Sequence, residues 1–299
     1  MTMLPSTDLP SVQQPAKGRR DRARRRRFRA PKPVYWLSIA WLGGIAMLAF
    51  LAPVLPLGSY VTAVGAPRIP PFTEWPEFLG TDQLGRSVLS RLLFGARDTM
   101  LIAFGATAIG LIVGTTIGVV AGYFRGPLDR IIGFVLDVLL AFPPLIVLLL
   151  LVSVLEPSMP TLLVALGFLA IPTFARLARA STLVWVDRPF IVAARTYGAT
   201  DLRIIIKDLL ANVILPLLTL LPIVVSGLIV AEGSLSYLGF GMPPPQPSWG
   251  NMISGGMQYL RTDPALVIIP ATAVFLTVFA LNIVGERTRS RYELPGANG

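Results

Sequence analysis

Long apolar runs, separated by polar or proline-rich segments, dominate the pattern of the sequence. An α-helix needs about 20 apolar residues to cross the ~30 Å hydrocarbon core of a bilayer. Runs of that length occupy residues 34–55, 99–122, 130–155, 161–182, 210–234 and 264–285. We therefore expect an all-α integral membrane protein with six transmembrane helices, which form a membrane domain over residues 34–285.

The basic residues predict how these helices are oriented. Residues 1–33 form a polar arm with a dense run of Arg, and like charges packed this closely are typical of disordered segments. Beside an apolar span, the arm is expected in the cytoplasm against anionic lipid rather than on nucleic acid. Most Lys and Arg residues of the other short loops fall on the same side. Both termini, including the tail 286–299, are therefore expected to be cytoplasmic. The first apolar run is longer than the core of a signal peptide, which favours an uncleaved span.

Composition excludes several classes of function. Hydrophobic residues make up 54% of the chain and charged residues only 14%, whereas a soluble domain carries roughly 25% charge. A soluble globular enzyme is therefore excluded. The chain has no Cys and no His, so thiol nucleophiles, Cys/His metal sites and imidazole acid–base chemistry are excluded as well. No P-loop motif is present. We expect neither an enzyme nor a cofactor or metal on this chain.

Two long loops, 56–98 and 236–263, are predicted on the outer side. Near the end of the first, a short amphipathic helix is expected on the outer surface, with Thr81 or Asp82 capping its start. Its apolar face would carry Leu84, Val88, Leu89, Leu92 and Leu93, and its polar face Arg86, Ser87, Ser90 and Arg91. The second loop is too rich in proline for a span, and Trp249 within it suits a membrane interface.

The cytoplasmic segment 186–208 predicts two short helices joined by a turn. Pro189 is typical of a helix start, Gly198 tolerates the left-handed conformation that ends a helix, and Thr200 can cap the next one. Small side chains on this segment would let another protein approach its backbone closely. They are Ala193, Ala194, Gly198 and Ala199. An ordinary amphipathic connector remains the alternative.

Small residues also recur at every fourth position of the second span: Ala106, Gly110, Gly114, Gly118 and Gly122. Such a ladder allows close packing against another helix. The neighbour could lie in the same chain or in a partner subunit, and packing within the chain is the favoured interpretation.

Three residues are candidates for a translocation pathway: Asp137, Pro143 and Glu232. An ionisable group inside a membrane is costly and is expected to face protein or a water-filled cavity. Pro143 and Pro144 break the third span close to Asp137, and broken helices often line cavities. Hydrogen-bonded structural acids are the alternative. A self-sufficient channel or proton-coupled carrier that uses Asp137 is the competing functional hypothesis.

Three stretches carry a resemblance to a known family. They read GTDQLGRSVLSR at 80–91, AARTYGATD at 193–201, and EGSLSYLGFG at 232–241, the last followed by SWG at 248–250. In this order and at these places in the topology, they resemble the permease subunits of bacterial ABC importers for dipeptides, oligopeptides and nickel, in particular the C-type permease. Val192 departs from the family pattern, which has Glu at this position.

The resemblance implies a type I ABC importer permease of the bacterial cytoplasmic (inner) membrane. Two homologous permeases would form the pore, an extracytoplasmic binding protein would deliver the substrate, and two P-loop ATPases would bind ATP and Mg²⁺. Each permease would couple to an ATPase through one cytoplasmic segment. In this chain the coupling residues would be Ala193, Ala194, Arg195, Gly198, Ala199, Thr200 and Asp201. Whether the solute is a peptide, a nickel complex or another small molecule stays open.

Overall fold

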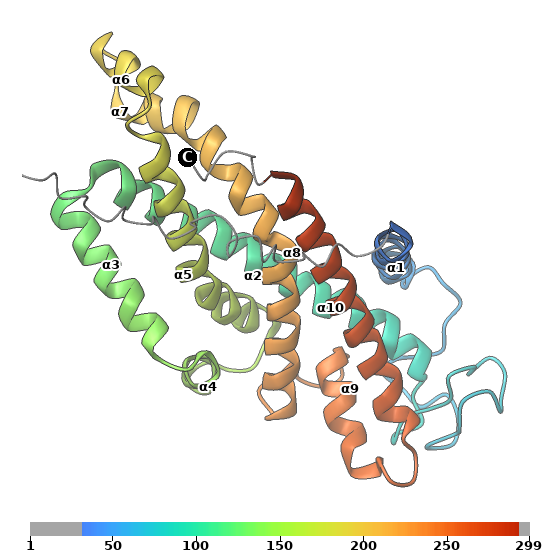
Figure 1. The fold of residues 1–299 in the computed structure, drawn as a ribbon. Helices are drawn as coiled ribbons and strands as arrows, with labels where there is room; N and C mark the ends of the chain where they lie inside the picture. Colours follow the sequence, from blue (N-terminus) through green and yellow to red (C-terminus); the bar gives the residue numbers. More distant parts are fainter. Residues whose placement is uncertain (1–31, 293–299) are drawn as a thin grey trace, which may run out of the picture.

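The computed structural model describes residues 32–292, and most of this part of the chain is helical (Figure 1). The predicted arm 1–33 and the end of the predicted tail lie outside the described residues, apart from the first residues of α1. The α-helices are α1 Lys32–Leu51, α2 Val88–Phe124, α3 Gly126–Ala141, α4 Pro144–Val154, α5 Met159–Trp185, α6 Pro189–Thr196, α7 Asp201–Arg203, α8 Leu210–Tyr237, α9 Trp249–Gly256 and α10 Ala265–Tyr292. A π-helical segment, Ile204–Leu209, joins α7 to α8.

The all-α membrane fold is confirmed. Within residues 32–292, five helices are long and apolar enough to cross a bilayer: α1, α2, α5, the continuous helix of residues 201–237, and α10. The predicted third span, 130–155, is divided between α3 and α4, which meet at an angle of 91°; it is the sixth span if the two helices cross the membrane together. Pro143 and Pro144 stand at this break; neither has a backbone N–H to continue the helical hydrogen bonds. In Figure 1, α3 runs along one side of the bundle and α4 lies across its end.

The two ends of the bundle differ. One end, called here the coupling end, carries α6, α7 and the turn between α2 and α3 (Figure 1). The other, called here the far end, carries α9 and the loop that connects α1 to α2. Residues at the coupling end are therefore close in space to the last turns of α2 and α5.

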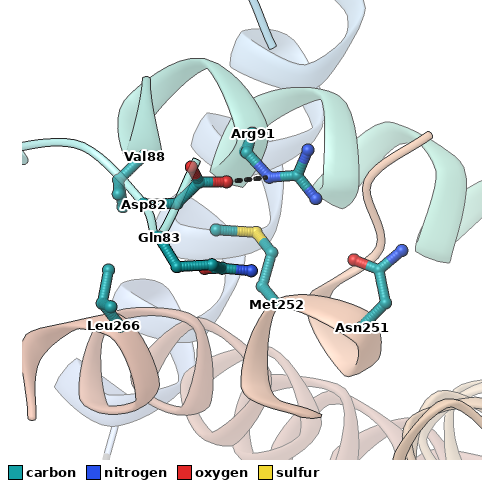
Figure 2. Close-up of a pocket in the computed structure, with 7 residues that line it drawn as sticks. All are labelled: Asp82, Gln83, Val88, Arg91, Asn251, Met252 and Leu266. Carbon is teal, nitrogen blue, oxygen red and sulfur yellow. Dashed lines mark ion pairs between the residues drawn. The ribbon is translucent and has the colours of Figure 1, made fainter. Parts of the chain in front are cut away.

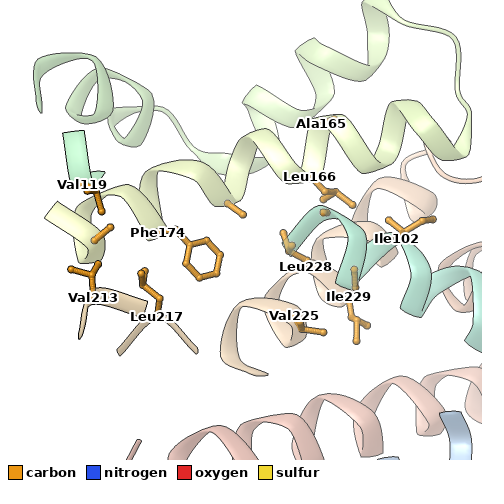
Figure 3. Close-up of a cluster of buried hydrophobic side chains, with 14 of the residues drawn as sticks. Ile102, Val119, Ala165, Leu166, Phe174, Val213, Leu217, Val225, Leu228 and Ile229 are labelled. Carbon is orange, nitrogen blue, oxygen red and sulfur yellow. The ribbon is translucent and has the colours of Figure 1, made fainter. Parts of the chain in front are cut away.

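Helices α2, α5 and α8 form the main core (Figure 3). Phe174 of α5 and Leu217 of α8 are completely buried there. The small-residue ladder of α2 lies against α5 of the same chain. A Cβ atom added to Gly114 would lie 2.7 Å from the carbonyl oxygen of Ile171, and that distance is shorter than real Cβ contacts. These glycines therefore permit backbone contact between two spans of one subunit.

The start of α2 corrects the prediction of a separate surface helix. The helix begins at Val88 and runs without a break for 37 residues into the second span. Its N-cap is Ser87, whose Oγ accepts the N–H of Ser90 at 3.3 Å, in place of the predicted Thr81 or Asp82. The amphipathic pattern thus belongs to the first turns of a membrane-spanning helix, and the loop before it is shorter than predicted.

Two arginines at this helix start are buried, whereas the sequence predicted them on an exposed face. Arg86 is 7% exposed and Arg91 is 6% exposed. Asp82 Oδ2 lies 2.7 Å from Arg86 Nε and 3.4 Å from Arg91 Nε, and the carbonyl of Tyr60 accepts from Arg91 at 3.0 Å. These partners offset the cost of burying the two guanidinium groups. Leu84, predicted on the apolar face, is 59% exposed.

Trp249, at the start of α9, is also placed differently from its prediction. Its side chain is completely buried, and its Nε1 donates to the carbonyl oxygen of Leu92 at 3.0 Å. The backbone N–H of Trp249 donates to Thr99 Oγ1 at 3.2 Å. This tryptophan therefore fixes α9 against α2 and is not free to lie at a membrane interface.

Candidate coupling segment and charged residues of the spans

The coupling segment, residues 186–208, is built from two short helices and a turn. Pro189 occupies the first turn of α6, where its missing N–H is not needed. Ile191 is completely buried and anchors α6 on the main core. Ala194 and Ala199 are half-buried against the same core. One face of α6 is thus fixed to the bundle and the other is left open.

Gly198 forms the turn between α6 and α7. Its φ of +78° is in the left-handed region, which side chains with a Cβ disfavour. The N–H of Gly198 donates to the carbonyl oxygen of Arg195 at 3.1 Å, and the N–H of Ala199 donates to the carbonyl oxygen of Ala194 at 3.0 Å. These two bonds are the Schellman pattern of a helix C-terminus. Thr200, in an extended conformation, then precedes α7 as its N-cap residue, without a side-chain capping bond.

The open face of the segment combines apolar and polar side chains. Tyr197 is 91% exposed, Leu202 68% and Val192 51%. The remaining residues predicted for coupling are exposed as well: Ala193, Arg195, Thr200 and Asp201. Large apolar side chains gathered at the end of a segment that projects from the bundle are typical of a surface that another protein covers.

Contacts with the end of α2 hold both halves of the segment. The Tyr123 hydroxyl donates to Asp201 Oδ1 at 2.5 Å, and the Arg195 guanidinium lies 5.3 Å from the centre of the Tyr123 ring. Arg125, just after α2, donates to Asp187 at 2.6 Å. Tyr123 therefore contacts α6 and α7 at once. Sequence reasoning missed this residue, because no local pattern links two positions 78 residues apart.

Asp137, in α3, is paired rather than isolated. The Arg176 guanidinium of α5 donates to its Oδ1 at 2.5 Å. One helical turn further along α5, Arg179 forms a fork with Asp129 of α3, in which Nη2 lies 2.7 Å from Oδ2 and Nε contacts Oδ1. The two arginines thus bridge α5 to α3.

Glu232, in α8, lies in a different environment. It is 1% exposed, and its Oε1 accepts from Ser236 at 2.8 Å. Its Oε2 has no hydrogen-bond partner among the described residues. Glu232 is thus enclosed at the junction of α8 and α9 and does not border open space in this conformation.

A small cavity at the far end separates the start of α2 from α9 (Figure 2). Its volume of about 20 Å³ is enough for a water molecule. Asp82 and Arg91, drawn paired in Figure 2, form one wall, and Asn251 and Met252 form the opposite wall. The cavity is too small for a peptide or a comparable solute.

Comparisons with known proteins agree with this architecture. Residues 114–292 match the family described as "Binding-protein-dependent transport system inner membrane component". A glutathione transport system permease protein of Pectobacterium atrosepticum is 36% identical over 212 residues, which cover 71% of this chain and 70% of that protein. A dipeptide transport system permease protein of Alkalihalophilus pseudofirmus is 32% identical over 245 residues, covering 81% and 80%.

A solved structure shares the fold at low sequence identity. An inward-facing conformation of the MetNI methionine ABC transporter superposes with a TM-score of 0.55 at 20% identity, over 68% of this chain and 96% of the matched chain. The expected fold of a type I ABC importer permease is therefore confirmed. The chain belongs to the family of binding-protein-dependent transport system inner membrane components, and it is a multi-pass protein of the cytoplasmic membrane.

Proposed function

We propose that the chain is a permease subunit of an ATP-driven importer, forms half of the pore for peptides or similar small solutes, and couples to a separate ATPase through the segment around Gly198. The observation that carries this proposal is the shape of the coupling segment. It projects from the coupling end, exposes Tyr197 and Leu202, and is fixed to the spans by Ile191 and Tyr123. The permease relatives for dipeptide and glutathione support the proposed class of solute.

The coupling end is the cytoplasmic end in this proposal, with both termini on the same side. A second homologous permease completes the pore, two P-loop ATPases carrying ATP and Mg²⁺ bind below, and an extracytoplasmic binding protein delivers the solute. This chain has no catalytic role. Closure of the ATPases moves the coupling segments and shifts the pore between inward and outward access.

The competing hypothesis is a self-sufficient channel or proton-coupled carrier based on Asp137. Asp137 is engaged by Arg176, and within residues 32–292 no His and no second carboxylate contacts this pair. A proton relay normally uses several titratable groups in a chain. The structure therefore favours the importer subunit.

Reconstituted vesicles separate the two hypotheses. The chain is co-expressed with its neighbouring permease, ATPase and binding-protein genes, and solute uptake is measured with ATP or with a proton gradient as the energy source. The proposal predicts uptake that requires ATP and all partners. Uptake by this chain alone, driven by the proton gradient, would support the carrier instead.

A further inference from the structure

Two ion pairs connect α3 and α5, and in both of them α3 carries the negative charge and α5 the positive charge. Both carboxylates, Asp129 and Asp137, belong to α3, and both guanidinium groups, Arg176 and Arg179, belong to α5. The acids are eight residues apart on α3 with Gly133 midway, so all three lie along one side of this helix. A negative and a positive edge thus run parallel from the coupling end into the spans.

The deeper pair lies inside the predicted spans. Asp137 is seven residues past residue 130, where the third span is predicted to start, and Arg176 is six residues before residue 182, where the fourth span is predicted to end. At 1.5 Å per residue, these separations are about 10 Å and 9 Å. Both of these span ends are at the coupling end (Figure 1). In a hydrocarbon core of ~30 Å, the pair therefore lies within the core, on the side of the coupling end.

This pair is nevertheless exposed in the single chain, with 53% of the Arg176 side chain and 69% of the Asp137 side chain accessible. Two charges at this depth do not face lipid, because charged groups in membrane spans face protein or water. The break at Pro143 lies six residues beyond Asp137 and frees backbone carbonyls, which also require water or polar partners. A Cβ atom at Gly133 would meet no other atom of the described chain within 4 Å. The exposed ion pair, the helix break at Pro143 and the open space beside Gly133 together indicate a water-filled path along this side of α3.

We propose that Asp137 and Arg176 form a transient binding site in the pore for the two charged ends of a zwitterionic solute. The solute's ammonium group pairs with the Asp137 carboxylate, and its carboxylate accepts hydrogen bonds from the Arg176 guanidinium. Asp129 and Arg179 form a second site of the same polarity, closer to the coupling end. This inference rests on the proposed importer function and specifies the chemistry of the pore.

When the solute binds, every charged group keeps a partner. One internal ion pair opens and two ion pairs to the solute replace it, so no charge is left unpaired inside the membrane. A solute with a blocked amine or a blocked carboxyl group would leave one protein charge without a partner, at the cost that buried unpaired charges carry. Binding is expected to be weak, because the solute has to leave the site for transport to proceed.

The absence of Cys from the sequence provides a direct test. Gly133→Cys places a single thiol beside Asp137 without disturbing the ion pair. The assembled complex, with its binding protein omitted and no ATP, is treated with a water-soluble maleimide in the presence of millimolar alanyl-alanine. N-acetylated and C-amidated forms of the same dipeptide serve as comparison ligands. Val135→Cys, about 160° around α3 from Asp137, is the matched control.

We expect the maleimide to label Gly133→Cys, free alanyl-alanine to slow that labelling severalfold, and both capped dipeptides to have little effect. Protection should disappear in Gly133→Cys/Asp137→Asn and Gly133→Cys/Arg176→Gln, and Val135→Cys should show none at all. Failure of the maleimide to reach Gly133→Cys would overturn the water-filled path. Equal protection by capped and free dipeptides, or none by either, would overturn the zwitterion site.

ATP-dependent uptake, measured on the same complex with the unaltered chain and the binding protein restored, keeps this inference separate from the proposed function. Normal uptake together with a negative labelling result would refute only the site. Absence of ATP-dependent uptake in the unaltered complex would refute the importer itself.

Discussion

Replacing Gly198 tests whether the turn of the coupling segment transmits motion. Its φ of +78° disfavours any residue with a Cβ, at about 1–2 kcal/mol for the left-handed conformation. No atom of the described chain lies within 4 Å of an added Cβ, so the substitution Gly198→Ala acts on backbone conformation and creates no clash. A free-energy difference of about 1.4 kcal/mol corresponds to a tenfold change in population. Gly198→Ala should therefore lower the population of the native turn conformation by roughly one order of magnitude. The expected result is ATP hydrolysis that continues while uptake per ATP falls.

Gly239 provides the matched control, since its φ is +88° and an added Cβ would also meet open space. It ends α8 at the far end, with the same Schellman pattern of backbone bonds as Gly198. Gly239→Ala should therefore carry a similar conformational cost and leave uptake per ATP unchanged. The assay is uptake and ATP hydrolysis in the same vesicles. Equal loss of coupling in both variants, or none in Gly198→Ala, would refute the reasoning.

Three further substitutions test other parts of the account. Tyr123→Phe removes the hydroxyl that donates to Asp201 but keeps the ring beside Arg195. The lost bond to a charged group is worth about 1.5–3 kcal/mol, so uptake per ATP should fall and the complex should unfold at a lower temperature. Gly114→Leu forces side-chain atoms into the backbone of α5. Thermal unfolding should show that the folded state is destabilised by about 1–3 kcal/mol or more. Asp82→Asn leaves two buried guanidinium groups without their carboxylate, a cost of about 3–5 kcal/mol that should sharply lower the yield of folded protein; a normal yield would show that these charges are solvated.

Much of the fold follows from the sequence because its determinants are local. A membrane span is a property of one continuous apolar run, and the break at Pro143 follows from the missing N–H groups of two adjacent prolines. The turn at Gly198 was predictable for the same reason, since the left-handed conformation depends on a single residue.

The sequence did not reveal features that depend on contacts between distant segments. The sequence pattern predicts Arg91 on the surface, whereas in the structure it is buried beside Asp82 and the carbonyl of Tyr60. Trp249 reads as an interface residue until α9 is seen to fold back onto α2. A tightly paired charge or a completely buried tryptophan is stabilised by its partners in space, and hydropathy along the chain carries no information about those partners.

The role of Tyr123 was hidden in the same way. Its position at the end of a span is typical of interfacial tyrosines. Only the position of α6 and α7 in the structure shows that it contacts the coupling segment. The pairing of Asp137 with Arg176 likewise needs the relative register of α3 and α5, which their separate sequences do not fix.

Cross-linking of the coupling segment tests the central claim most directly. Tyr197→Cys introduces a single thiol at a side chain that is 91% exposed at the coupling end, and Leu84→Cys introduces one at a side chain that is 59% exposed at the far end. A short thiol-to-amine cross-linker is applied to intact cells that express the complete transporter. The account predicts that Tyr197→Cys captures the ATPase and that Leu84→Cys does not. Failure of Tyr197→Cys to capture it, or capture by Leu84→Cys, would contradict the account.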